Sequence, residues 1–155
     1  MYRTRPLPLL AISLALVLWP ATSSSAAGHK YINVPRASEL ARKAPFSDAV
    51  LAGNTLYLAG RIGVDAKTNR VPETPEEEAR NVMEQFRAVL KEAGMSFEDV
   101  VFVQVYCSDV ALFEKFNSVY RGYFKEGEFP ARAFLGSGTL LFDARFEVQM
   151  IAVKR

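Results

Sequence analysis

The sequence predicts a single α+β domain in which two helices cover one face of one mixed β-sheet. A length of 155 residues suits one domain. β-prone runs and helical periodicities follow one another in the order β-β-α-β-α-β-β. Each predicted helix connects two strands and carries one strongly apolar stripe, so both helices are expected on the same side of the sheet.

The first two strands are expected to form a hairpin. Apolar runs at 49–52 and 55–59 flank Gly53 and Asn54, a pair typical of tight turns. The following stretch, 60–71, is expected to be a loop.

Local signals define the first helix. Thr74 is the expected N-cap, Pro75 takes the first helical position, and Glu77 completes a capping box. Gly94 is expected to close the helix. Its apolar stripe consists of Ala79, Val82, Met83, Phe86, Val89, Leu90 and Ala93.

The second half of the chain predicts a central strand over 100–107, a helix capped by Asp109, and strands near 132–136 and 146–153. Cys107 lies within the apolar central strand and is interpreted as a small buried hydrophobic residue. The inner face of the second helix is expected to carry Leu112, Phe113, Phe116, Val119, Tyr120, Tyr123 and Phe124.

One face of this sheet has no predicted cover. Both helices occupy the other side, and the sequence offers no further amphipathic helix for this face. A second subunit is the simplest way to bury it, so an oligomer is expected.

Composition excludes several classes of function. The chain carries 19 basic and 17 acidic residues, a formal net charge of +2, so nucleic acid is not an expected partner. One Cys and one His exclude a disulfide framework and a multi-histidine metal site, and no metal site is expected. His29 is interpreted as part of a solvated tail. The acids at 76–78 are interpreted as charges that favour the helix dipole.

The first 27 residues have the three parts of a secretory signal peptide. Arg3 and Arg5 precede an apolar run over 7–19, and small residues follow at 21–28. A run of about 13 apolar residues is too short for a bilayer-spanning helix, which needs roughly 20. We therefore expect cleavage after Ala26 or Ala27, a periplasmic or secreted protein, a domain over 28–155 and no lasting membrane anchor.

Arg132 and Glu147 are the candidate functional pair. If the last two strands form a hairpin centred between Thr139 and Leu140, Arg132 and Glu147 face each other across it. A cross-strand salt bridge is one interpretation. The other is a guanidinium that holds a ligand carboxylate, with the acid nearby to orient water.

Motifs along the chain, in one order and at matching spacings, resemble those of a known family. They are Ala-Pro-Phe-Ser-Asp-Ala at 44–49, Ala-Gly-Arg-Ile-Gly at 59–63, the strand over 99–109, the helix residues Phe113, Asn117, Tyr120, Tyr123 and Phe124, Pro-Ala-Arg at 130–132 and Phe-Glu-Val at 146–148. From about Ala44 onward the chain resembles the reactive intermediate deaminase family, RidA, also called YjgF.

The resemblance implies a homotrimer of chorismate-mutase-like α+β subunits, with a site in each cleft between neighbours. It implies cofactor-independent hydrolysis of enamines and imines to 2-oxo acids and ammonia. Arg132 then corresponds to the arginine that holds the substrate carboxylate, and Glu147 to the acid that positions water. Gly60 and Asn117 correspond to other positions of the substrate site.

Three site positions depart from the family pattern. Phe46 stands where the family has a tyrosine, Ala59 where it has a serine, and Phe134 where a cysteine is common. The first two changes remove hydroxyls, so the pocket is expected to be more apolar and to take a bulkier substrate, or to have lost turnover. A non-catalytic trimer that binds small carboxylates or proteins is therefore the alternative to imine hydrolysis. RNA cleavage is the least favoured reading because the charge is nearly balanced.

Overall fold

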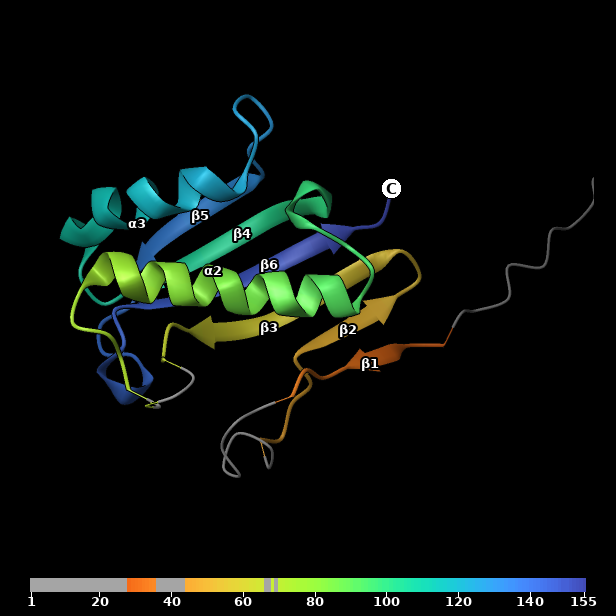
Figure 1. Ribbon diagram of the computed structural model, residues 1–155, viewed down its shortest axis with the longest axis horizontal. Helices are drawn as coiled ribbons and strands as arrows, with labels where there is room; N and C mark the ends of the chain where they lie inside the picture. Colours follow the sequence, from red (N-terminus) through yellow and green to blue (C-terminus); the bar gives the residue numbers. More distant parts are fainter. Residues whose placement is uncertain (1–27, 36–43, 66–67, 69) are drawn as a thin grey trace, which may run out of the picture.

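The computed structural model describes residues 28–35, 44–65, 68 and 70–155. Within these residues one sheet has the order β1-β2-β3-β6-β4-β5, and helices α2 and α3 lie across one of its faces (Figure 1). The predicted signal peptide lies outside the described residues. The elements are β1 Lys30–Ile32, β2 Ala49–Ala52, β3 Thr55–Ile62, α2 Pro75–Glu92, β4 Val100–Cys107, α3 Phe113–Tyr120, β5 Ala131–Gly136 and β6 Phe146–Val153.

The predicted fold class is confirmed. Strand β4 pairs in parallel with β5, whereas the other neighbouring strands pair antiparallel, so the sheet is mixed. Both helices pack on the same face, as their apolar stripes predict. No helix among the described residues has the length and apolar character needed to cross a membrane.

The predicted pairing of the last two strands is wrong. Strand β6 lies between β3 and β4, and β5 lies at the sheet edge beyond β4. Arg132 is therefore opposite Val103 of β4, and Glu147 is opposite Tyr106 of β4. The short connection suggested a hairpin, but the chain between the two strands instead passes the end of β4.

The predicted loop over 60–71 begins too early, because β3 continues through Ile62. The pairing of β3 with β6 changes register between Leu58 and Arg61, which is a β-bulge that includes Gly60. Arg61 is held by an ion pair with Asp48 at 2.5 Å and a hydrogen bond to Gln85 Oε1 of α2 at 3.1 Å.

Strand β1 was not predicted from the sequence; it has only three residues and pairs with β2. The buried Asp48 fixes this edge. Its Oδ2 accepts a hydrogen bond from the Val34 N–H at 2.8 Å, and its own N–H donates to Asn33 Oδ1 at 3.2 Å. His29 is exposed just before β1, as a solvated position should be.

Helix α2 begins and ends where its local signals predict. The Thr74 hydroxyl accepts a hydrogen bond from the Glu77 N–H at 3.3 Å, and Pro75 opens the helix. The reciprocal half of a capping box is not formed between these described residues. Gly94 has a φ of 69°, and the Gly94 and Met95 N–H groups close a Schellman motif on Lys91 and Leu90.

The second helical segment is divided into three parts. Asp109 caps a 3-10 turn, Val110–Leu112, and α3 follows without a side-chain cap of its own. Another 3-10 turn, Arg121–Tyr123, follows α3. Most of the predicted inner face packs on the core, but Phe113 is exposed, because it lies at the rim of a cavity described below.

The core lies between the sheet and the helices. Alternate residues of β6, from Phe146 to Ala152, are buried beneath the helices, together with Val103 and Val105 of β4. Cys107 is fully buried and unpaired, as predicted, and its thiol donates to the Asp109 carbonyl at 3.0 Å. The opposite face of the sheet leaves Tyr57 and Leu135 exposed.

Glu78 lies in the first turn of α2, as predicted, but it also has a structural role that the sequence did not indicate. Its side chain is completely buried and accepts hydrogen bonds from the Arg145 and Phe146 N–H groups at 2.7 and 3.0 Å. Arg145 Nη1 also pairs with Glu78 at 2.8 Å and donates to the Pro72 carbonyl at 2.9 Å. This network joins the start of α2 to the start of β6.

Candidate functional site

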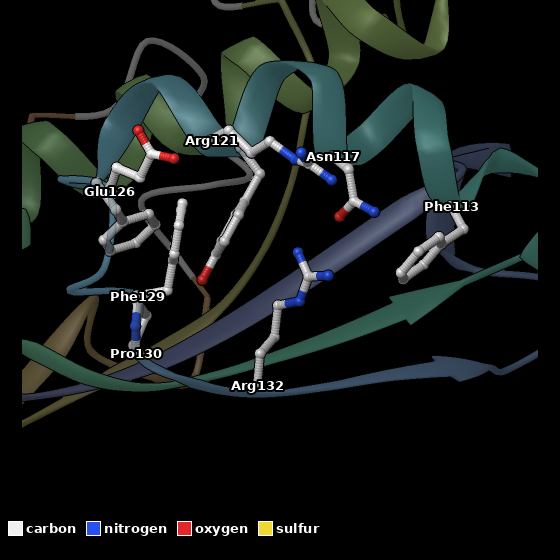
Figure 2. Close-up of a pocket in the computed structure, with 9 residues that line it drawn as sticks. Phe113, Asn117, Arg121, Glu126, Phe129, Pro130 and Arg132 are labelled. Carbon is white, nitrogen blue, oxygen red and sulfur yellow. The ribbon is translucent and has the colours of Figure 1, made fainter.

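The guanidinium of Arg132 lies between the edge strand β5 and helix α3 (Figure 2). Its side chain points from the sheet toward the helix, and the carboxamide of Asn117 points toward it from α3. Aromatic rings surround the cation. Arg132 Cζ is 4.6 Å from the ring centroid of Tyr120, 5.6 Å from that of Phe113 and 6.0 Å from that of Phe134.

Arg132 makes no hydrogen bond or ion pair with any described residue. Burial lowers the pKa of its guanidinium from the usual value, and the nearby Tyr120 acts in the opposite direction. An arginine remains charged at neutral pH even so. A half-buried cation with aromatic faces and no anionic partner is therefore ready to receive a ligand anion.

A cavity of about 690 Å³ opens in front of Arg132. Phe113, Phe124 and Phe129 supply much of its apolar lining. Asn117 and Tyr120 add polar groups beside the guanidinium. Arg121 and Glu126 also line the cavity. The site therefore combines two cations, one acid, neutral hydrogen-bonding groups and an aromatic wall, and the aromatic wall beside Arg132 suits a small carboxylate with an apolar side chain.

Two polar groups in this cavity have no hydrogen-bond partner within the described chain, and one of them, the Tyr120 hydroxyl, is completely buried. Asn117 is only 4% exposed, and its carboxamide makes no hydrogen bond to a described residue. The Tyr120 hydroxyl is buried and also lacks a hydrogen bond. Burial raises the pKa of Tyr120 to about 12, with Arg132 opposing that rise. Unsatisfied buried groups are rare in folded proteins, so the Tyr120 hydroxyl is a candidate for a ligand contact, and the Asn117 carboxamide that lines the same cavity is a second one.

Glu147 lies on the opposite, helix-free face of the sheet. It lines a smaller cavity, about 310 Å³, together with Gly60, Tyr106, Leu140 and Gln149. The carboxylate covers the backbone of Gly60 so closely that a Cβ there would overlap Glu147 Oε1. Glycine at this position in the bulge therefore allows the carboxylate to occupy its place.

Arg132 and Glu147 cannot meet within one chain. Arg132 is in register with the buried Val103, and Glu147 is in register with Tyr106, three residues further along β4. Side chains alternate between faces along a strand, so the two residues lie on opposite faces. The predicted cross-strand salt bridge is therefore absent between these two described residues, and β4 separates their strands.

The remaining predicted site residues divide between these locations. Phe134 joins Arg132 on the helix side, and Gly60 joins Glu147 on the open side. Phe46 is 56% exposed and Ala59 donates its N–H to the Asp48 carbonyl at 3.0 Å, but neither lines these two cavities. The sequence reading placed Phe113 and Tyr120 only in the core. The signal for a site role was their place in the same helix motif as Asn117, which the resemblance assigned to the substrate site.

The comparison with known proteins decides the family. Residues 36–154 match the family described as Endoribonuclease L-PSP. The chain belongs to this family, the RidA/YjgF family. It is 37% identical over 111 residues to a RutC family protein of Sulfurisphaera tokodaii, covering 71% of this chain and 88% of that one. It is also 37% identical over 111 residues to the 2-iminobutanoate/2-iminopropanoate deaminase of Bos taurus, covering 71% and 80%.

Solved structures of RidA proteins share the fold. The YjgF gene product from E. coli is 30% identical and has a TM-score of 0.72, with 81% of this chain and 99% of that chain covered. E. coli TdcF with bound serine is 27% identical with the same TM-score and the same coverage. The RidA-like assignment from the sequence is thereby confirmed, and relatives support imine deamination as the general class of activity.

Proposed function

We propose that this protein hydrolyses reactive 2-imino acids and their enamine tautomers to 2-oxo acids and ammonia. The observation that carries the proposal is the Arg132 guanidinium, which is half-buried, surrounded by aromatic rings and without an anionic partner among the described residues. A planar guanidinium binds a carboxylate through two parallel hydrogen bonds. A 2-imino acid carries that carboxylate next to its reactive carbon.

The reaction mainly requires that the protein position the substrate and a water molecule. Water adds its oxygen to C2, one of its protons passes to nitrogen, and the C=N bond becomes a single bond. The C2 hydroxyl proton then passes to the same nitrogen, the C–N bond breaks, the C=O bond forms and ammonia leaves. No electrons are transferred, so the reaction needs no redox cofactor. In this proposal Arg132 fixes the carboxylate, Asn117 orients the substrate and Glu147 positions the water.

This mechanism requires two copies of the chain, because Arg132 and Glu147 lie on opposite sheet faces. We propose a homotrimer in which the helix-free face of one subunit meets the β5 edge of its neighbour, so that Glu147 of one subunit approaches Arg132 of the next. The exposed Tyr57 and Leu135 on that face support an interface. Light scattering should give about three times the subunit mass. A monomer at micromolar concentration would contradict the shared site.

Relatives support the reaction class. The Bos taurus relative is named 2-iminobutanoate/2-iminopropanoate deaminase. The E. coli TdcF structure is titled as containing bound serine, a small molecule with a carboxylate. The family description refers to an endoribonuclease, but 19 basic against 17 acidic residues give little attraction for RNA.

A non-catalytic role as a binder of small carboxylates is the second candidate. Phe46 and Ala59 lack the hydroxyls that the family pattern has at these positions, which favours this reading. Both functions need the Arg132 pocket, but only hydrolysis needs Glu147 to act on the same ligand. The two candidates therefore differ in turnover and not in ligand binding.

The test is ammonia release from imines that an amino-acid oxidase generates in situ. The parent protein should accelerate hydrolysis, and Arg132→Ala should abolish the acceleration. Arg87→Ala is the matched control, because Arg87 also stacks on two aromatic rings but does not line the cavity. No acceleration over a broad panel, with retained 2-oxo-acid binding, would establish the binding role instead.

We also propose export of the mature protein. The basic start, short apolar run and small residues of positions 1–27 support cleavage near Ala27 and a periplasmic or secreted location. Mass measurement on protein from the extracytoplasmic fraction checks the cleavage site. Material that retains positions 1–26 there would contradict it.

A further inference from the structure

The Tyr120 hydroxyl is a buried polar group that the fold itself does not use. Tyr120 is 4% exposed, and its ring packs against Phe116 and Phe124 with centroid distances of 5.7 and 4.7 Å. These contacts fix the ring without the oxygen. The hydroxyl has no hydrogen-bond partner within the described chain, which lowers the stability of the folded state relative to a phenylalanine at this position.

Tyr120 and the Arg132 cation lie at the same cavity. Both residues line the 690 Å³ cavity, and Arg132 Cζ is 4.6 Å from the centroid of the Tyr120 ring. The pKa of Tyr120, raised by burial to about 12, keeps the hydroxyl protonated throughout the physiological range. It is therefore available as a hydrogen-bond donor beside the guanidinium.

We propose that the Tyr120 hydroxyl hydrogen-bonds the 2-oxo or 2-imino acid held by Arg132. This inference rests on the proposed function, since it assigns a further contact in the same site. It also explains the unpartnered oxygen, because a bound ligand satisfies it. Since Phe46 and Ala59 bring no hydroxyl to the site, Tyr120 supplies a hydroxyl to this pocket from helix α3.

The test is Tyr120→Phe, which removes the oxygen and keeps the packed ring. Calorimetric titration with 2-oxobutanoate and with butanoate measures ligand affinity, and thermal unfolding measures stability. The variant should bind about fivefold more weakly, as expected for one lost hydrogen bond. Its melting temperature should be unchanged or higher, because no internal hydrogen bond is lost. Weaker binding of both acids places the contact on the carboxylate, and weaker binding of 2-oxobutanoate alone places it at C2.

Tyr123→Phe is the matched control. The Tyr123 hydroxyl donates to Glu84 at 2.8 Å and does not line the cavity, so its removal should leave both affinities unchanged. Unchanged affinity of Tyr120→Phe, with Arg132-dependent binding intact in the parent, would overturn this inference alone. A lower melting temperature for Tyr120→Phe would also overturn it, because the hydroxyl would then have an internal partner. A parent protein that binds neither acid would overturn the proposed function as well.

Discussion

Arg132→Ala distinguishes a ligand-binding arginine from a structural one. The substitution removes a guanidinium that has aromatic neighbours but no ion pair or hydrogen bond with a described residue. The effects on stability and on binding can therefore be worked out separately.

The loss of stability should be small. The cation is half-buried, and exposed cation–π contacts contribute about 0.5–1 kcal/mol. Three rings share one cation, so we expect a total cost of about 1 kcal/mol and a decrease in melting temperature of a few degrees. Arg145→Ala is the contrasting variant, because it leaves Glu78 buried without its ion-pair partner. That change should cost about 3–5 kcal/mol.

The loss of ligand affinity should be large. A bidentate contact between a guanidinium and a carboxylate contributes about 1.5–3 kcal/mol, equivalent to roughly 10- to 150-fold in affinity. Arg132→Lys keeps the charge but not the planar fork, so it should lose much of this affinity.

Calorimetric titration with a 2-oxo acid and thermal unfolding of the same samples provide the assay. We expect Arg132→Ala to melt close to the parent protein while binding and turnover are lost together. An Arg132→Ala protein that unfolds at ordinary temperature would show a structural arginine. A stable variant with parental turnover would remove Arg132 from the mechanism.

Three further predictions follow from the same geometry. Gly60→Ala should fold but displace the Glu147 carboxylate, because a Cβ at this position would overlap it. The variant should have a kcat about 100-fold lower and nearly the same affinity for a 2-oxo acid, and a parental kcat would contradict the role of Glu147. Phe46→Tyr combined with Ala59→Ser should raise turnover of small imines by about fivefold for each useful hydrogen bond; a folded variant without gain would show a differently organised pocket. Burial raises the pKa of the Cys107 thiol, so iodoacetamide should label it only after unfolding, and mass spectrometry of native protein checks this.

Local signals in the sequence were sufficient for much of the fold. The Thr74 cap, Pro75 and Gly94 located helix α2 because each acts on the backbone of its own segment. Strand pairing was harder, because β5 and β6 follow each other in the chain but both neighbour β4. Which strands pair depends on packing across the whole sheet, and no local residue pattern specifies it.

The site was predictable in composition but not in arrangement. Arg132 and Glu147 were identified, yet the assumed hairpin put them face to face instead of on opposite sides of the sheet. Tyr120 was interpreted as a core residue because it falls on the apolar face of the second predicted helix. Only the three-dimensional structure reveals that its hydroxyl is buried beside Arg132 without a hydrogen-bond partner among the described residues.

Subunit complementation tests the central claim most directly, namely that Arg132 and Glu147 of different copies form one hydrolytic site. Arg132→Ala and Glu147→Gln chains, each inactive alone, are co-expressed with different tags, and the mixed oligomers are purified. In a closed trimeric ring that contains both chains, one of the three sites always combines an intact Arg132 with a neighbour's intact Glu147. We therefore predict that the purified mixed oligomers recover about a third of the parental imine hydrolysis. Mixed oligomers that stay inactive, or a Glu147→Gln protein that is fully active alone, would contradict the account.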